Sequence, residues 1–208
     1  MSEPKVLYTL RQVVYDTNIA LAELNDILAA EDIDDMTGYA AAAEGDGAVL
    51  TNAAGGGTTG LTAIAARIEH PRNVVITLVN AGLVTGNVRV CGIGMTGFPT
   101  NELFAITPVL TYTGNVPFLR IDEVHVWGVT GTLTTADTMS IGVGAKIGVP
   151  LGVNETLHDV VKERFNLADV AVTPANINRT YGTYIPTSTL DAAKVLELWY
   201  VTKRTLIW

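Results

Sequence analysis

Histidine and serine side chains could bind a metal ion or attack a bond, and their spacing tests both possibilities. A zinc site needs ligands at close spacing, such as two histidines four residues apart or a His-x-Glu pair. The three histidines are instead scattered singly, at His70, His125 and His158. A hydrolase of the nucleophile-elbow type places its serine in Gly-x-Ser-x-Gly, and none of the three serines has that context. These residues predict neither a metal site nor a nucleophile.

Two glycine-rich segments match nucleotide-binding loops only in part. Residues 55–60, GGGTTG, fit the dinucleotide pattern, but no βαβ unit surrounds them and no acidic residue follows about twenty positions later. Residues 142–146, GVGAK, lack the Ser or Thr that follows the lysine of a phosphate loop. The neighbouring carboxylates of Asp122 and Glu123 would point to opposite faces of a strand, which does not suit paired acid–base work. We therefore expect a protein that is not an enzyme and uses no cofactor or metal.

Composition and charge limit the remaining classes. The 208 residues are 48% hydrophobic and only 16% charged, with 20 glycines, which indicates a globular chain with a core. The formal charge of −8 argues against a nucleic-acid partner, which needs a basic surface. The single cysteine, Cys91, excludes an intrachain disulfide. We see neither a signal peptide nor a stretch of about twenty apolar residues, so we expect synthesis in a cytoplasm and no membrane partner.

The N-terminal segment carries the whole net charge. Residues 1–46 hold ten acidic and two basic residues, and the rest of the chain is balanced. Between residues 5 and 30 there is no Gly or Pro, and apolar residues recur at alternating spacings of three and four, with Thr17 in one slot. This spacing predicts a helix over residues 5–30. Its stripe, which would either join copies of the chain or pack on its own sheet, is Leu7, Leu10, Val14, Leu21, Leu24 and Leu28.

The pattern changes after this segment, and we divide the chain accordingly. Residues 1–47 are predicted to be an acidic helix and linker, and residues 48–208 a β-sandwich domain. The acids at 31–35 indicate a solvated loop or a basic partner, and residues 36–60, rich in Ala, Gly and Thr, indicate a pliable arm. Deletion of residues 1–60 is expected to abolish assembly and to leave a folded β domain.

Short β-branched runs separated by turn residues follow from residue 61. They predict an antiparallel, jelly-roll-like sandwich with an N-terminal helix and arm. Val124 and Val126 would face the core, while Trp127 would face outward, either as an interface residue or under a loop. Residues 155–165 are an expected short helix in a long connection. The predicted strands are 61–68, 73–79, 87–93, 102–107, 118–129, 139–144, 169–172 and 195–202.

The order of these segments resembles a β-sandwich of structural proteins from tailed bacteriophages and related viruses. Residues 71–77 and 85–92 are similar to its first hairpin, and residues 102–107 and 118–131 to its next strands. The most specific part is residues 136–150, ADTMSIGVGAKIGVP, which resembles a segment AGDTVSVGTGDKIGLP of those proteins. Ala145 stands where that pattern has Asp, and the acidic N-terminal segment lies outside the resemblance, which covers about residues 48–203.

The resemblance implies a virion component, most plausibly a capsid decoration or head auxiliary protein. Its implied partners are other copies of itself, as a trimer, and the major capsid protein, and its implied place is the capsid surface. A tail or head–tail connector component is the alternative within the same class. A carbohydrate-binding sandwich is the alternative from another class, although only Trp199 and Tyr200 form a close aromatic pair.

Overall fold

The computed structural model describes residues 5–15, 23–32, 48–51, 67–79, 85–107, 111–131, 138–152, 154–191 and 193–206. Within these ranges the chain is mainly β, its sheets are antiparallel, and the one helical element is the 3₁₀ turn Pro174–Asn176. The prediction of an antiparallel β-sandwich is confirmed at this level. The strands are β1 (Lys5–Tyr15), β2 (Glu23–Asp32), β3 (Ala48–Thr51), β4 (Arg67–Val79), β5 (Thr85–Gly94), β6 (Pro99–Ile106), β7 (Thr111–Thr130), β8 (Thr138–Gly148), β9 (Glu155–Phe165), β10 (Ala168–Val170), β11 (Ile177–Asn178), β12 (Thr183–Tyr184) and β13 (Leu196–Leu206).

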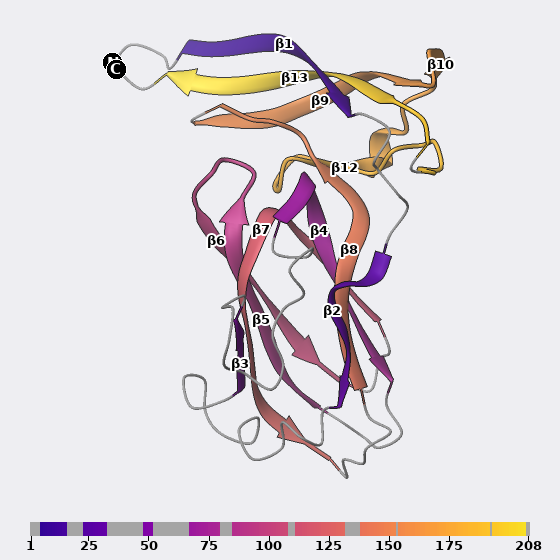
Figure 1. Ribbon diagram of the computed structural model, residues 1–208. Helices are drawn as coiled ribbons and strands as arrows, with labels where there is room; N and C mark the ends of the chain where they lie inside the picture. Colours follow the sequence, from indigo (N-terminus) through magenta and orange to yellow (C-terminus); the bar gives the residue numbers. More distant parts are fainter. Residues whose placement is uncertain are drawn as a thin grey trace.

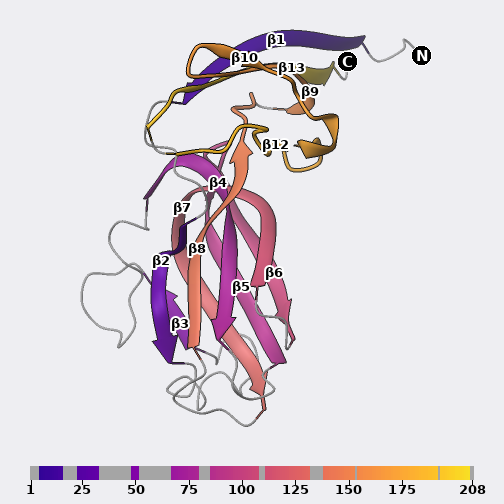
Figure 2. The ribbon, with the colours of Figure 1, turned by 90° about the vertical axis from the view of Figure 1, so that its right-hand side faces the viewer.

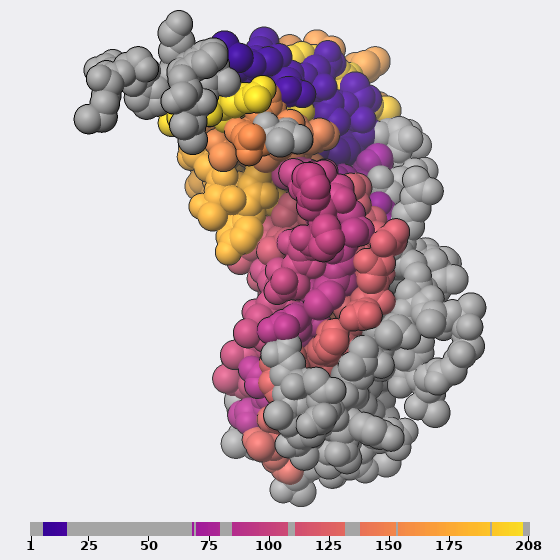
Figure 3. Space-filling model, turned by 90° about the vertical axis from the view of Figure 1, so that its left-hand side faces the viewer, coloured from indigo at the N-terminus to yellow at the C-terminus, as the bar shows by residue number. Residues whose placement is uncertain are grey.

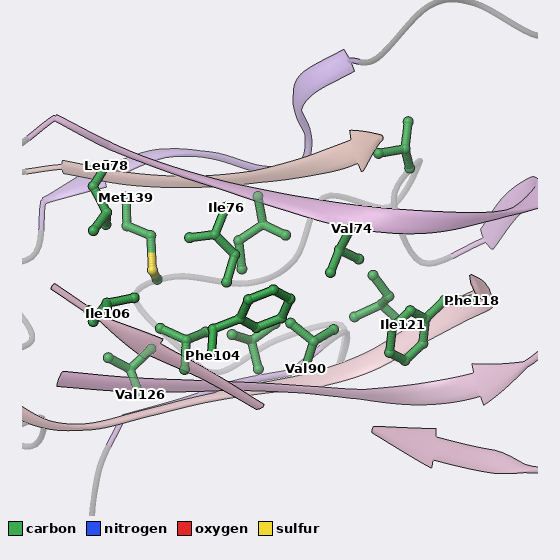
Figure 4. Close-up of a cluster of buried hydrophobic side chains, with 14 of the residues drawn as sticks. Val74, Ile76, Leu78, Val90, Phe104, Ile106, Phe118, Ile121, Val126 and Met139 are labelled. Atoms are coloured by element: carbon green, nitrogen blue, oxygen red, sulfur yellow. The ribbon is translucent and has the colours of Figure 1, made fainter. Parts of the chain in front are cut away.

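Nine strands form one sheet that folds back on itself as a sandwich. Its order is β11-β12-β8-β4-β7-β5-β6, with β2 paired to β8 and β3 to β7. The long strand β7 makes the fold possible, because its first half pairs with β4 and its second half with β5. Figure 4 shows side chains of β4 and β8 meeting those of β5, β6 and β7 between the two layers.

Alternation of apolar residues builds the sandwich core. Successive side chains of a strand point to opposite faces, so every second residue can be buried. Val74, Ile76 and Leu78 of β4 follow this rule, as do Val124 and Val126 of β7, whose predicted inward orientation is confirmed. This first core consists of Ile68, Val74, Ile76, Leu78, Val88, Val90, Phe104, Ile106, Phe118, Ile121, Val124, Val126, Val129, Met139, Ile141 and Val143.

The other four strands form a second sheet, which we call the cap sheet. Its order is β1-β13-β9-β10, and it lies across one end of the sandwich (Figures 1 and 2). A second core joins its inner face to the end of β8 and to the segment around β12. Its members are Tyr15, Ile147, Val149, Leu157, Val160, Ile177, Tyr184, Leu190, Leu196, Leu198 and Tyr200.

The predicted helix over residues 5–30 is wrong, because this part of the chain contains the strands β1 and β2. In β1, β-branched and aromatic residues such as Val6, Tyr8 and Val13 favour a strand, and all eleven residues pair with β13. In β2, a composition rich in Leu, Ala and Glu favours a helix, and pairing with β8 overrides it. The described parts of segment 1–47 thus pair with strands of segment 48–208, and the boundary between the segments stays a prediction.

The expected short helix at residues 155–165 is also wrong, because this segment is the strand β9. Its pairing with β13 is interrupted twice, and each interruption leaves one residue of β9 without an opposite partner. These extra residues, His158 and Val161, are the mark of β-bulges. The bulges bring Leu157, Val160 and Glu163 to the same buried face at a spacing of three, which imitates the periodicity of a helix.

Candidate interaction surface

The outer face of the cap sheet is a surface that the rest of the described chain leaves uncovered. In β13 the side chains of Leu196, Leu198, Tyr200 and Thr202 are buried against the sandwich, and the residues between them face away. Residues directly opposite in neighbouring strands share a face. The outer face of β1 is therefore formed by Tyr8, Leu10, Gln12 and Val14, which lie opposite Lys203, Val201, Trp199 and Glu197.

Several apolar side chains on this sheet are more than half exposed. Leu10 is 64% exposed, Val14 55%, Tyr8 54% and the bulge residue Val161 of β9 51%. Together with Trp199 and Val201, which are partly exposed, we call them the cap surface. Figure 3 shows the atoms of β1, in indigo, at the upper surface of the molecule. Exposed apolar side chains that gather on one sheet face make this surface a candidate for an interaction site.

A charged cluster borders the cap surface on the side of β10. Lys162 Nζ and the guanidinium of Arg164 lie 5.1 and 5.3 Å from the centre of the Trp199 ring. Both cations also reach Asp169 of β10, at 2.9 Å from Lys162 and 3.1 Å from Arg164. These two donors lower the pKa of Asp169. The stacked cations hold the indole in place beside the apolar residues, which makes a rigid aromatic anchor.

The structure divides the six residues of the predicted stripe. Leu10 and Val14 lie on the outer face of β1, while Leu7, an odd-numbered neighbour, points to the other face and is 53% exposed. Leu24 and Leu28 belong to β2, whose side chains lie outside the described residues, as does Leu21 altogether. The predicted helical stripe is thus not formed: Leu10 and Val14 are exposed on the outer face of β1, and Leu7 is exposed on its opposite face. The self-association that the stripe predicted stays a prediction.

The structure separates the aromatic pair that supported a carbohydrate platform. Trp199 faces outward, whereas Tyr200 is buried and donates its hydroxyl hydrogen to the carbonyl of Pro150 at 2.7 Å. Trp127, which was expected to face outward, is half-buried, and the guanidinium of Arg89 on the neighbouring strand lies 5.7 Å from its ring.

One pocket, of about 340 Å³, opens between β8 and the segment around β11 and β12. Its two cations are already engaged by the fold. Lys146 Nζ donates to the carbonyl of Gly114 at 2.8 Å and to Asn115 Oδ1 at 2.6 Å. Arg179 Nε donates to the carbonyl of His158 at 2.6 Å. Both cations of the pocket thus already have acceptors within the protein.

The histidines are as dispersed in space as in sequence. His125 contacts Glu123 at 3.0 Å, His158 packs its ring on Tyr8, and His70 lies edge-on to Tyr15. Among the residues that the structure describes, no three His, Cys, Asp or Glu side chains gather as a metal site would require. The predicted glycine segment 142–146 lies within β8, and the segment 55–60 lies outside the described residues.

Sequence reasoning missed two features of the cap sheet. The first is the outer cluster around Trp199. The alternation Leu-Glu-Leu-Trp-Tyr-Val-Thr-Lys of β13 indicates which of its residues face outward, but the bulges interrupt the matching alternation in β9.

The second feature is Glu163, whose carboxylate is fully buried. It accepts hydrogen bonds from the Tyr184 hydroxyl at 2.6 Å and from the backbone N–H groups of Thr187 and Ser188 at 2.9 Å. No short-range pattern indicates this contact.

Comparison of the chain with protein-family models, with curated proteins and with solved structures finds no match. In the described part of the chain, no helix has the length and apolar character that crossing a membrane requires.

Proposed function

We propose that this protein is a structural subunit that acts by binding copies of itself and a larger assembly through the cap sheet. The observation that carries this proposal is the cap surface, where exposed Tyr8, Leu10, Val14 and Val161 lie beside the anchored ring of Trp199. Burial of apolar surface at about 25 cal/mol per Å² makes such a face favourable to cover. A specific contact needs only about 800 Å² from each partner, and repeated contacts on a lattice strengthen one another.

We further propose that the assembly is a virus particle and that the protein is a capsid decoration protein of a tailed bacteriophage or a related virus. The support for this step is the resemblance of residues 48–203 to virion β-sandwich proteins, together with the antiparallel sandwich itself. In this role the protein binds the lattice of the major capsid protein and stabilises the head. It acts at the capsid surface after synthesis in the host cytoplasm, with no nucleic-acid or membrane partner. The resemblance makes a trimer the oligomer of that role.

The proposal is tested by binding of the purified chain to empty heads of the virus that encodes it. Val161→Asp places a charge on the cap surface and is expected to reduce occupancy at least about tenfold, because it desolvates a carboxylate at the contact. Leu103→Asp is the matched control, since Leu103 is 53% exposed on β6 of the sandwich and lies outside the cap sheet.

Particle imaging then separates the two virion roles. Many copies spread over the head support a decoration protein, whereas a single ring at a vertex or on the tail supports a connector and contradicts decoration. Equal loss of binding in both aspartate variants would contradict the cap surface as the docking site. Specific glycan binding with no binding to particles would overturn the virion role.

A further inference from the structure

The outer edge of β1 is a long strand edge that the described chain leaves open. β1 pairs with β13 along all eleven residues on one side, and no strand of the described ranges pairs with its other side. An open edge presents alternate N–H and C=O groups that can template a further strand. Proteins usually protect such edges with proline, a bulge or charges that point inward. β1 contains no proline and no glycine, and its register with β13 is continuous.

The largest side chains of β1 lean away from this open edge. Tyr8 reaches across β13 and packs its ring on His158 of β9, with ring centres 4.9 Å apart. On the opposite face, Arg11 reaches past β13 and its Nη2 donates to Glu155 Oε1 of β9 at 2.9 Å. The guanidinium is therefore held toward the interior of the sheet, where it cannot repel a strand that approaches the edge. These two side chains therefore do not cover the open edge.

We propose that β1 pairs antiparallel with β1 of a second copy of this chain, about a two-fold axis that passes near Leu10. In this register Leu10 lies opposite Leu10, and Tyr8 lies opposite Gln12. Val6 then lies opposite Val14. On the other face, Leu7 lies opposite Val13, and Thr9 opposite Arg11. No like charges meet in this register, and because Leu10 is the middle residue of β1, all eleven residues of each copy find a partner.

The other edge of the cap sheet favours this two-fold contact over a ring. That edge is β10, which is only three residues long, Ala168–Val170. A head-to-tail contact of β1 with β10 would therefore leave most of β1 unpaired. In the two-fold contact both copies contribute the same eleven-residue edge, which is the isologous geometry of most homodimers. The two cap sheets then form one continuous eight-stranded sheet, and their apolar outer faces become adjacent.

This inference rests on the proposed function for the role of self-association, and it replaces the trimer that the resemblance implies with a two-fold dimer as the form of the free subunit. Its test uses the purified full chain without any particle, so the two proposals can fail separately. Analytical ultracentrifugation over a concentration series is expected to give twice the chain mass of 22.1 kDa. Leu10→Lys, which places two lysines opposite each other at the axis, is expected to raise the dissociation constant at least about tenfold. Leu103→Lys, on the sandwich, is expected to leave it unchanged.

Cysteine cross-linking tests the register in a Cys91→Ser background. Leu10→Cys is expected to form a disulfide-linked dimer, because the two side chains lie opposite each other near the axis. Val14→Cys, which is similarly exposed, is expected to remain uncross-linked because the two copies of residue 14 lie about 27 Å apart along the strands. A monomer or a trimer at all concentrations would overturn the proposal. So would equal cross-linking of both variants, or a complex that forms only with an extended segment of another protein.

Discussion

At the scale of single residues, the tip of the β9–β10 hairpin carries backbone strain. Its two-residue loop, Asn166-Leu167, has positive φ at both positions, 50° and 68°, as a type I′ turn requires. Asparagine tolerates this region, but for leucine it costs about 1–2 kcal/mol. Leu167 is 78% exposed, so little packing offsets the strain. We expect Leu167→Gly to raise the free energy of unfolding by about 0.5–1 kcal/mol, measured by urea denaturation.

Leu167→Ala is the control for this prediction. Alanine keeps the Cβ atom and therefore the strain, while it removes the exposed apolar atoms. We expect its free energy of unfolding to remain near that of the parent chain. An equal gain in both variants would show that removal of the exposed side chain, and not relief of the backbone, produces the effect.

A second residue-scale prediction concerns Glu163, which ties the cap sheet to the segment after β12. Its removal in Glu163→Ala leaves the buried Tyr184 hydroxyl and the partly buried backbone N–H groups of Thr187 and Ser188 without this acceptor. Unmet polar groups cost about 1–3 kcal/mol each, and we expect a total loss of about 3 kcal/mol in the free energy of unfolding. Tyr184→Phe removes one donor and leaves the others, so about 1 kcal/mol is expected. Equal losses, measured by urea denaturation, would contradict a shared network centred on the carboxylate.

The same contact affects the titration of Tyr184. Burial, and next the hydrogen bond to Glu163, raise the pKa of its hydroxyl to about 12. A raised pKa means that the contribution of this tyrosine to stability is complete below its unfolded value of about 10 and is lost as the pH rises through about 12. This side chain therefore strengthens the second core throughout the neutral range.

At the scale of elements, the ion pair between Arg11 and Glu155 adds to the strand pairing that attaches β1 to the cap sheet. Burial raises the pKa of Glu155, but the Gly152 N–H and Arg11 outweigh it and lower this pKa below its usual value. The stabilising contribution is thus present above the unfolded pKa of about 4.3 and is lost as the pH falls through the folded pKa. We expect Glu155→Gln to cost about 0.5–1 kcal/mol at pH 7, since Arg11 is partly exposed, and to weaken the dependence of stability on pH below 5.

Hydrogen exchange locates this effect. Glu155→Gln is expected to speed amide exchange in β1 selectively, because Arg11, which loses its charged partner, lies on that strand. Asp169→Asn is the matched control, since the pKa of Asp169 is also lowered by cations but its partners, Lys162 and Arg164, lie on β9. Faster exchange of β1 in both variants would mean that general loss of charge, and not the link to Arg11, loosens the strand.

The elements also show how much of the fold the sequence reveals. Strands whose buried residues alternate, such as β5 and β13, could be predicted within a few residues. β9 could not, because its bulges give the buried face a spacing of three. Gly114 resembles a turn residue, yet it lies inside β7 because the Glu102 carboxylate accepts the N–H groups of Asn115 and Val116. An added Cβ at Gly114 would collide with that carboxylate, which local sequence cannot reveal.

Only part of the candidate surface could be predicted from the sequence. Exposed apolar residues at positions 10 and 14 belong to the predicted stripe, and the inference that this segment contacts other copies follows from the same residues. Their true neighbours, Trp199 and Val201, come from the other end of the chain. Pairing between chain ends is set by the tertiary fold, so the sequence pattern identified apolar residues but neither their secondary structure nor their face.

At the scale of the whole molecule, one strand, β8, contributes side chains to both cores. β8 contributes Met139, Ile141 and Val143 to the first core, that of the sandwich, and its far end places Ile147 in the second core, under the cap sheet. The Tyr15 hydroxyl also donates to the carbonyl of Gly148 at 3.0 Å, next to that end of the strand. Unfolding of either core would therefore remove packing partners of β8 and destabilise the other core. This arrangement predicts a single cooperative transition for the entire described body.

Two tryptophans report on the two cores separately and test this coupling. In a Trp208→Phe background, Trp127→Phe leaves Trp199 as the reporter of the cap sheet, and Trp199→Phe leaves Trp127 as the reporter of the sandwich. We expect the same urea midpoint and slope from both reporters. Addition of Ile141→Ala, in the sandwich core, is expected to cost about 2–5 kcal/mol and to shift both midpoints together, because β8 transmits the loss. A cap-sheet reporter that keeps its midpoint while the sandwich reporter moves would show that the two parts unfold independently. In that case, the cap sheet could rearrange on a partner without disturbing the sandwich.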